Sequence, residues 1–231
     1  MATSKNQRTE KEMDLSFMTI RKAVGWLGIA LPIIVSVGTW VFGCCAHLKP
    51  SVSSYYYTTM GNFLTGILCA VALFMFTYKG FDWRDQLATN IAGFFAASTA
   101  IFPTDYDPHS AFCDVFSKLP GCISNKVHYL SAAIFFVTLA YTSIFLFTKS
   151  DKNKIERGIQ KRRRNRIYRT CGIIMVVALL LILSLQITTV SEAVGKYDPE
   201  FFLETITLWA FGFSWLVKGE TILKDHPPQG S

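Results

Sequence analysis

The chain has 231 residues, a formal net charge of +7, 51% hydrophobic residues and only 17% charged residues. A soluble domain usually carries about 25% charged residues, and charges are costly inside a bilayer. Because the apolar residues form long blocks between short polar stretches, the composition argues against an ordinary soluble domain and favours a protein that spans a membrane.

Six blocks approach the roughly 20 apolar residues that a transmembrane helix needs. The residues between 173 and 180 show no alternation of apolar and polar side chains, which excludes a transmembrane barrel. The predicted fold class is therefore all-α, a polytopic bundle of six transmembrane helices. The predicted spans are residues 23–46, 60–78, 86–103, 127–148, 171–190 and 200–217.

A polar N-terminal arm is expected to be unstructured or frayed, with a helix beginning near Asp14. The first apolar block exceeds the roughly 7–15 residues of a signal-peptide core, so we expect it to be retained. The predicted divisions are the cytoplasmic arm (1–22), the transmembrane domain (23–217) with an outer loop (104–126) and a basic cytoplasmic loop (149–169), and a disordered cytoplasmic tail (218–231).

The placement of Lys and Arg predicts the orientation of the spans. Strict alternation puts 19 of the 23 basic residues on one side, ten of them in the 149–169 loop. The positive-inside rule then places both termini in the cytoplasm of a multi-pass plasma-membrane protein, in a bacterium the inner membrane. The basic loop is expected to contact anionic lipid headgroups, and no nucleic-acid partner is predicted.

Small and aromatic side chains give two further expectations. Gly61, Gly66 and the small residues between 88 and 97 favour close helix packing. Aromatic residues near the span ends, among them Tyr55 and Tyr78, are typical of an interfacial belt.

Polar residues gather near the outer ends of the spans, where they predict a binding pocket. The pocket candidates are His128, Ser131, Asp105, Asp107, His109, Glu204 and Ser53. If a metal such as zinc binds, its ligands would be His128, His109 and Asp105. HExxH is absent and no cofactor is predicted. The alternatives are that the aspartates solvate a loop, that His128 lies at the interface, and that the sixth helix begins only after Glu204.

Two pairings are predicted from spacing. Cys113 and Cys122 share the outer loop and form a disulfide if that compartment is oxidising; free thiols, or pairing with Cys44 or Cys45, are the alternatives. On the other side, the carboxylates of Asp82 and Asp85 are expected to pair locally, with Lys79 and Arg84.

Four stretches, 51–58, 78–82, 102–104 and 128–136, together resemble a group of bacterial six-helix membrane proteins of unassigned function. That group is distantly similar to the DRAM/Frag-type families. The resemblance covers about residues 20–220 and implies the fold without an activity.

A weaker resemblance is to the intramembrane metal hydrolases of the ceramidase/adiponectin-receptor class, which combine a Ser, an Asp and several His on neighbouring helices. Ser53, Asp105 and His128 would take these roles, but the paired C-terminal histidines are missing.

Three functions follow from these residues. The first is a non-enzymatic membrane protein that binds a lipid or small solute in an outward-facing polar pocket. The second is a metal-dependent lipid hydrolase. The third is a small channel or transporter, with Asn62, Asn90 and Gln186 along its path. For each function, the sequence is also compatible with a homo-oligomer.

Overall fold

The computed structural model describes residues 2–43, 47–78, 80, 82–104, 121–149, 159–185 and 197–222. All regular secondary structure in these ranges is helical, as the sequence predicts. The elements are α1 (Ala2–Phe42), the 3-10 turn η1 (Ser53–Tyr57), α2 (Gly61–Thr77), α3 (Trp83–Ile101), α4 (Gly121–Tyr141), the π-helical η2 (Thr142–Leu146), α5 (Ile159–Leu185) and α7 (Pro199–Lys218).

Four of these helical segments are long and apolar enough to cross a membrane. They are Phe17–Phe42, Ile123–Leu146, Ile159–Leu185 and Pro199–Lys218. α2 is apolar but shorter, and α3 begins with the polar residues Arg84, Asp85 and Gln86. These lengths and compositions support a membrane helix bundle.

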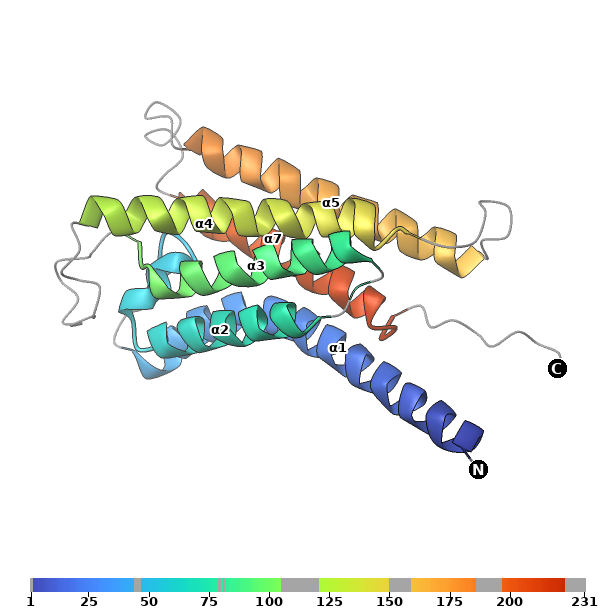
Figure 1. The fold of residues 1–231 in the computed structure, drawn as a ribbon. Helices are drawn as coiled ribbons and strands as arrows, with labels where there is room; N and C mark the ends of the chain where they lie inside the picture. Colours follow the sequence, from blue (N-terminus) through green and yellow to red (C-terminus); the bar gives the residue numbers. More distant parts are fainter. Residues whose placement is uncertain are drawn as a thin grey trace.

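Successive helices run in opposite directions along the bundle (Figure 1). α7 packs against α1 and α5, and α3 packs between α2 and α4. The first residues of α1, the end of α2 and the last residues of α7 lie at one end (Figure 1). We call this the basic end, because Arg21, Lys149, Lys161–Arg164 and Lys218 belong to it. The opposite end, which holds η1 and His128, is called the histidine end.

The helix bounds refine the predicted divisions. α1 begins at Ala2 rather than near Asp14, so the expectation of an unstructured arm is wrong. α5 begins at Ile159, which makes the second half of the predicted basic loop an extension of that helix. α4 begins at Gly121, inside the predicted outer loop. Residues 105–120, 150–158 and 223–231 lie outside the described residues.

Glycines permit the closest helix contacts, although not all the predicted ones. A Cβ at Gly212 would lie 2.5 Å from the Gly25 carbonyl oxygen, so α1 and α7 cross backbone against backbone. A Cβ at Gly93 would lie 3.0 Å from the Ala72 carbonyl oxygen, which brings α3 close to α2. Gly66 faces open space, so the expected close packing at that position is wrong.

A buried aromatic cluster closes the core at the basic end. The indole of Trp215 is fully buried, and its ring centroid lies 5.2 Å from those of Tyr78 and Phe147. Tyr78 is 3% exposed and Tyr55 only 1%. Both are therefore core residues, which corrects their assignment to an interfacial belt.

Candidate functional site

At the histidine end, the structure brings Ser53 and His128 together. The His128 ring is buried, and its Nδ1 lies 2.7 Å from the Phe102 carbonyl oxygen. A carbonyl only accepts, so Nδ1 carries the proton in the neutral ring and Nε2 is left as an acceptor. The Ser53 Oγ lies 3.0 Å from Nε2 and is placed to donate to it.

Glu204 joins the same group from α7. It lies in the second turn of a helix that begins at Pro199, so the alternative in which the helix begins only after Glu204 is wrong. Its Oε2 accepts a hydrogen bond of 2.5 Å from the Val52 N–H, and its Oε1 lies 3.5 Å from the Ser53 Oγ. The carboxyl group therefore links α7 to the segment before η1.

These contacts fasten the segment before η1 to α4 and α7. Ser53 and His128 make the contact that a serine nucleophile and its general base need. However, a backbone N–H that could stabilise an oxyanion, that of Val52, already donates to Glu204. None of the three cavities described in the structure is lined by these residues.

The remaining predicted pocket residues are not brought into this group. The Ser131 hydroxyl lies 2.8 Å from that of Ser98. Asp105, Asp107 and His109 lie outside the described residues, as do Cys113 and the side chain of Cys122. Within the described part of the chain, no three His, Cys, Asp or Glu side chains are grouped as metal ligands would be.

The polar residues expected along a transport path are also separate. Asn62 is exposed, and the Asn90 Oδ1 accepts a hydrogen bond of 3.2 Å from the Gln86 Nε2. Gln186 lies outside the described residues.

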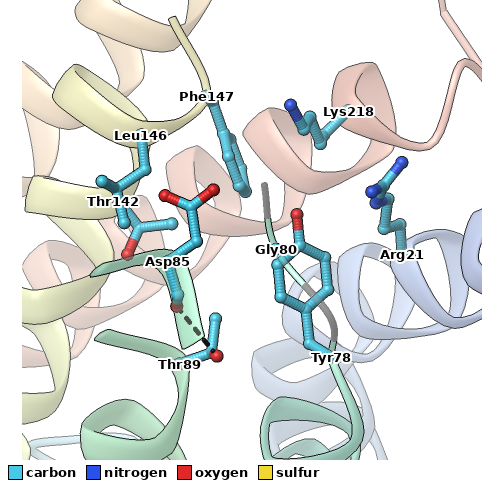
Figure 2. Close-up of a pocket in the computed structure, with 9 residues that line it drawn as sticks. All are labelled: Arg21, Tyr78, Gly80, Asp85, Thr89, Thr142, Leu146, Phe147 and Lys218. Carbon is cyan, nitrogen blue, oxygen red and sulfur yellow. Dashed lines mark hydrogen bonds between the residues drawn. The ribbon is translucent and has the colours of Figure 1, made fainter. Parts of the chain in front are cut away.

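A polar cavity of about 120 Å³ lies at the basic end, where sequence reasoning expected no site. Five segments of the chain contribute to its wall (Figure 2). They provide Arg21 from α1, Tyr78 and Gly80 after α2, Asp85 and Thr89 from α3, Thr142, Leu146 and Phe147 from η2 and its end, and Lys218 from α7.

The π-helical segment η2 helps to shape this cavity. π-Helical turns are rare and occur frequently at functional sites. Here the turn follows α4 directly, and two of its residues, Thr142 and Leu146, line the wall. Between them, the Ser143 hydroxyl lies 2.9 Å from that of Ser214, which ties the turn to α7.

Two basic side chains, those of Arg21 and Lys218, face the cavity. The Arg21 guanidinium lies 5.3 Å from the centre of the Tyr78 ring, and the Lys218 Nζ lies 5.2 Å from that of Phe147. In the described part of the chain, neither cation forms an ion pair with a carboxylate. The Arg21 Nε is buried and has no hydrogen-bond partner there.

The carboxylates of this region are held by a different cation. Lys149 Nζ lies 2.8 Å from both Asp82 Oδ2 and Asp85 Oδ1. The predicted pairing with Arg84 is wrong, because its guanidinium lies over the Trp83 ring, 5.6 Å from the centroid. Lys79, the other expected partner, lies outside the described residues.

Electrostatics around this ion pair follow from its contacts. The hydrogen bond from Lys149 is the main reason that the pKa of Asp82 is lowered, and Asp82 also caps α3 through the Arg84 and Asp85 N–H groups. Burial acts against the charge of Lys149, but the hydrogen bonds to Asp82 and Asp85 outweigh it and raise its pKa. Lys149 thus pairs with both carboxylates, and among the described residues neither forms an ion pair with Arg21 or Lys218.

The cavity therefore has a cationic side, formed by Arg21 and Lys218, and an acidic side, where Lys149 compensates the charge of Asp85. Figure 2 shows the head groups of Arg21 and Lys218 on one side and the Asp85 carboxyl group on the other, with the Tyr78 hydroxyl between them. The Thr89 and Thr142 hydroxyls donate to backbone carbonyls, at 3.1 and 2.8 Å. The donors available to a ligand are therefore mainly those of the two cations.

No protein-family model matches this chain, and no curated protein or solved structure shows significant similarity to it.

Proposed function

We propose that the chain is a plasma-membrane protein of six spans, with both termini in the cytoplasm, that binds a phosphate-bearing anion in the cavity at its basic end. Four long apolar helices support the membrane assignment. The packing of α2 and α3 within the same bundle favours six spans. The orientation is supported by the 19 of 23 Lys and Arg residues that this topology assigns to the cytoplasm.

The observation that carries the ligand proposal is that Arg21 and Lys218 form no ion pair with a carboxylate among the described residues. Removing a charge from water costs several kcal/mol even after the protein relaxes, unless an opposite charge compensates it. The two aromatic rings offset part of this cost, about 0.5–2 kcal/mol for each cation. A bound anion would supply the missing partner.

The donor chemistry favours phosphate. A guanidinium offers parallel N–H groups that match two phosphate oxygens, and lysine adds a compact charge. A cavity of about 120 Å³ exceeds several-fold the roughly 10–15 Å³ that a single water molecule needs. The phosphate could belong to a lipid headgroup or to a free phosphate compound, and the chemistry of the site is the same for both.

Thermal unfolding of the full-length protein in detergent tests this proposal. The probes are inorganic phosphate, short-chain phosphatidic acid, and short-chain diacylglycerol, which lacks the phosphate. A ligand that binds only the folded state stabilises it by about 2.7 kcal/mol at 100 times its Kd, and this stabilisation raises Tm. We expect stabilisation by at least one phosphate-bearing probe and none by diacylglycerol.

Substitution of the cations locates the effect. Arg21→Gln and Lys218→Gln should each lower the stabilisation by the effective probe, while Arg163→Gln, at an exposed arginine of α5, should retain it in full. Stabilisation by phosphatidic acid alone identifies a lipid headgroup, and stabilisation by both probes identifies a general phosphate site. No stabilisation by either, or an unchanged response in both cavity variants, overturns the proposal.

The topology has its own test. Arg163→Cys, in a background without other reactive thiols, should react with a membrane-impermeant maleimide only after the cytoplasmic side is opened. Labelling of intact cells would contradict the orientation.

A further inference from the structure

A second hollow lies between α3 and α4 on the surface of the bundle. This groove has a volume of about 460 Å³ and an apolar floor. Arg84, Leu87, Ala88 and Ile91 form its α3 side at the i, i+3, i+4 and i+7 spacing of one helix face. Val137 faces them from α4. Ala88 is buried, whereas Leu87 and Val137 remain half exposed.

One end of the groove carries a cation and aromatic side chains. Trp83 and Arg84 begin α3, and Tyr141 ends α4. The Arg84 guanidinium lies beside the Trp83 ring and has no carboxylate partner in the described part of the chain. The nearby carboxylates of Asp82 and Asp85 are held by Lys149. Arg84 is therefore free to bind an anion at the mouth of an apolar groove.

We propose that this groove binds one acidic phospholipid, with its phosphate on Arg84 and an acyl chain along the α3–α4 floor. The groove follows α3 from Trp83 to Ile91, about 12 Å at 1.5 Å per residue. That length covers most of one leaflet of a hydrocarbon core of about 30 Å. Trp83 and Tyr141 take the interfacial position that aromatic residues prefer.

The proposed topology places the basic end on the cytoplasmic side, so the bound phospholipid would belong to the cytoplasmic leaflet. The groove itself does not depend on the proposed anion in the cavity. Arg84 and Val137 do not line that cavity, and Arg21 and Lys218 do not line the groove. Each of the two binding proposals can therefore be refuted without refuting the other.

Native mass spectrometry of the full-length protein tests the groove. Detergent-solubilised protein is equilibrated with phosphatidylglycerol or phosphatidylcholine of identical acyl chains, and the retained lipid is counted. In the Arg21→Gln/Lys218→Gln background, where the cavity lacks its cations, we expect one phosphatidylglycerol per chain, retained at least about tenfold better than phosphatidylcholine. Arg84→Gln should remove this preference, and Val137→Trp, which fills the groove from its exposed wall, should lower retention of both lipids.

Matched variants keep the result interpretable. Arg163→Gln, at an exposed arginine of the same end, and the pair Arg21→Gln/Lys218→Gln should retain the preference, and Tm should show that each variant is folded. An unchanged preference in Arg84→Gln overturns the proposal. A change of oligomeric state in Val137→Trp would also overturn it, because the groove would then be an interface between copies of the chain.

Discussion

Replacement of Glu204 tests whether the group at the histidine end is a structural fastening. The Val52 N–H is buried and donates to Glu204 Oε2, whereas the 3.5 Å contact with the Ser53 hydroxyl is too long to add much. Glu204→Ala therefore leaves one buried donor unsatisfied, at a cost of about 1–3 kcal/mol. The Phe201 N–H still donates to the Pro50 carbonyl at 2.9 Å, so the fold should survive.

For a chain of 150–250 residues, about 1–3 kcal/mol corresponds to a fall in Tm of about 2–12 °C. Thermal unfolding of the purified full-length protein, followed by circular dichroism, measures this fall. Glu204→Gln retains an acceptor for the Val52 N–H, so its Tm should fall by less than half as much as that of Glu204→Ala. Glu200→Ala, one turn earlier and without a hydrogen bond in the described structure, should change Tm little. Equal losses for Glu204→Ala and Glu204→Gln, or none for Glu204→Ala, would refute the reasoning.

Two further predictions concern packing and pH. Gly212→Ala places a methyl group against the backbone of α1 and should destabilise by about 1–3 kcal/mol, while Gly66→Ala, which faces open space, should be neutral or slightly stabilising. Equal effects in thermal unfolding would argue against the close α1–α7 crossing. Because the pKa of Asp82 is lowered in the folded state, its contribution to stability is present above about pH 4 and is lost as the pH falls through the lowered pKa. Lys149→Gln should therefore lower the Tm at neutral pH and weaken its dependence on acid pH; parallel pH profiles for the two proteins would contradict this.

The sequence predicts helix class and placement well because membrane burial constrains composition over whole segments. Each span predicted at residues 60–78, 86–103 and 200–217 differs from its helix by no more than three residues at either end. The sequence predicts a loop at the beginning of α4, because the apolar pattern starts only after Gly121. Whether a helix continues through polar residues depends on their local helix propensity. The mean hydropathy of a segment does not measure that propensity.

The cavity at the basic end could not be predicted in the same way. Arg21 and Lys218 lie where the positive-inside rule already expects cations. Their positions in the sequence therefore do not indicate a binding site. Asp85 was expected to pair with a near neighbour, whereas its partner Lys149 lies at the end of another helix. Thr142 lies within an apolar stretch that can also form a regular α-helix, and the π-helical turn has no sequence rule of its own.

The candidate site residues at the two ends of the bundle differ in their partners. At the histidine end, the His128 ring nitrogens and the Val52 N–H find partners within the protein, so these groups offer a ligand little. At the basic end, Arg21 faces a cavity with an unpartnered, buried Nε. Because a partly buried charge without a carboxylate partner carries a desolvation cost, we expect this end to gain more from an anion than the His128 group gains from a polar ligand. The unsatisfied charge, and not the number of polar residues gathered in one place, identifies the better candidate for a binding site.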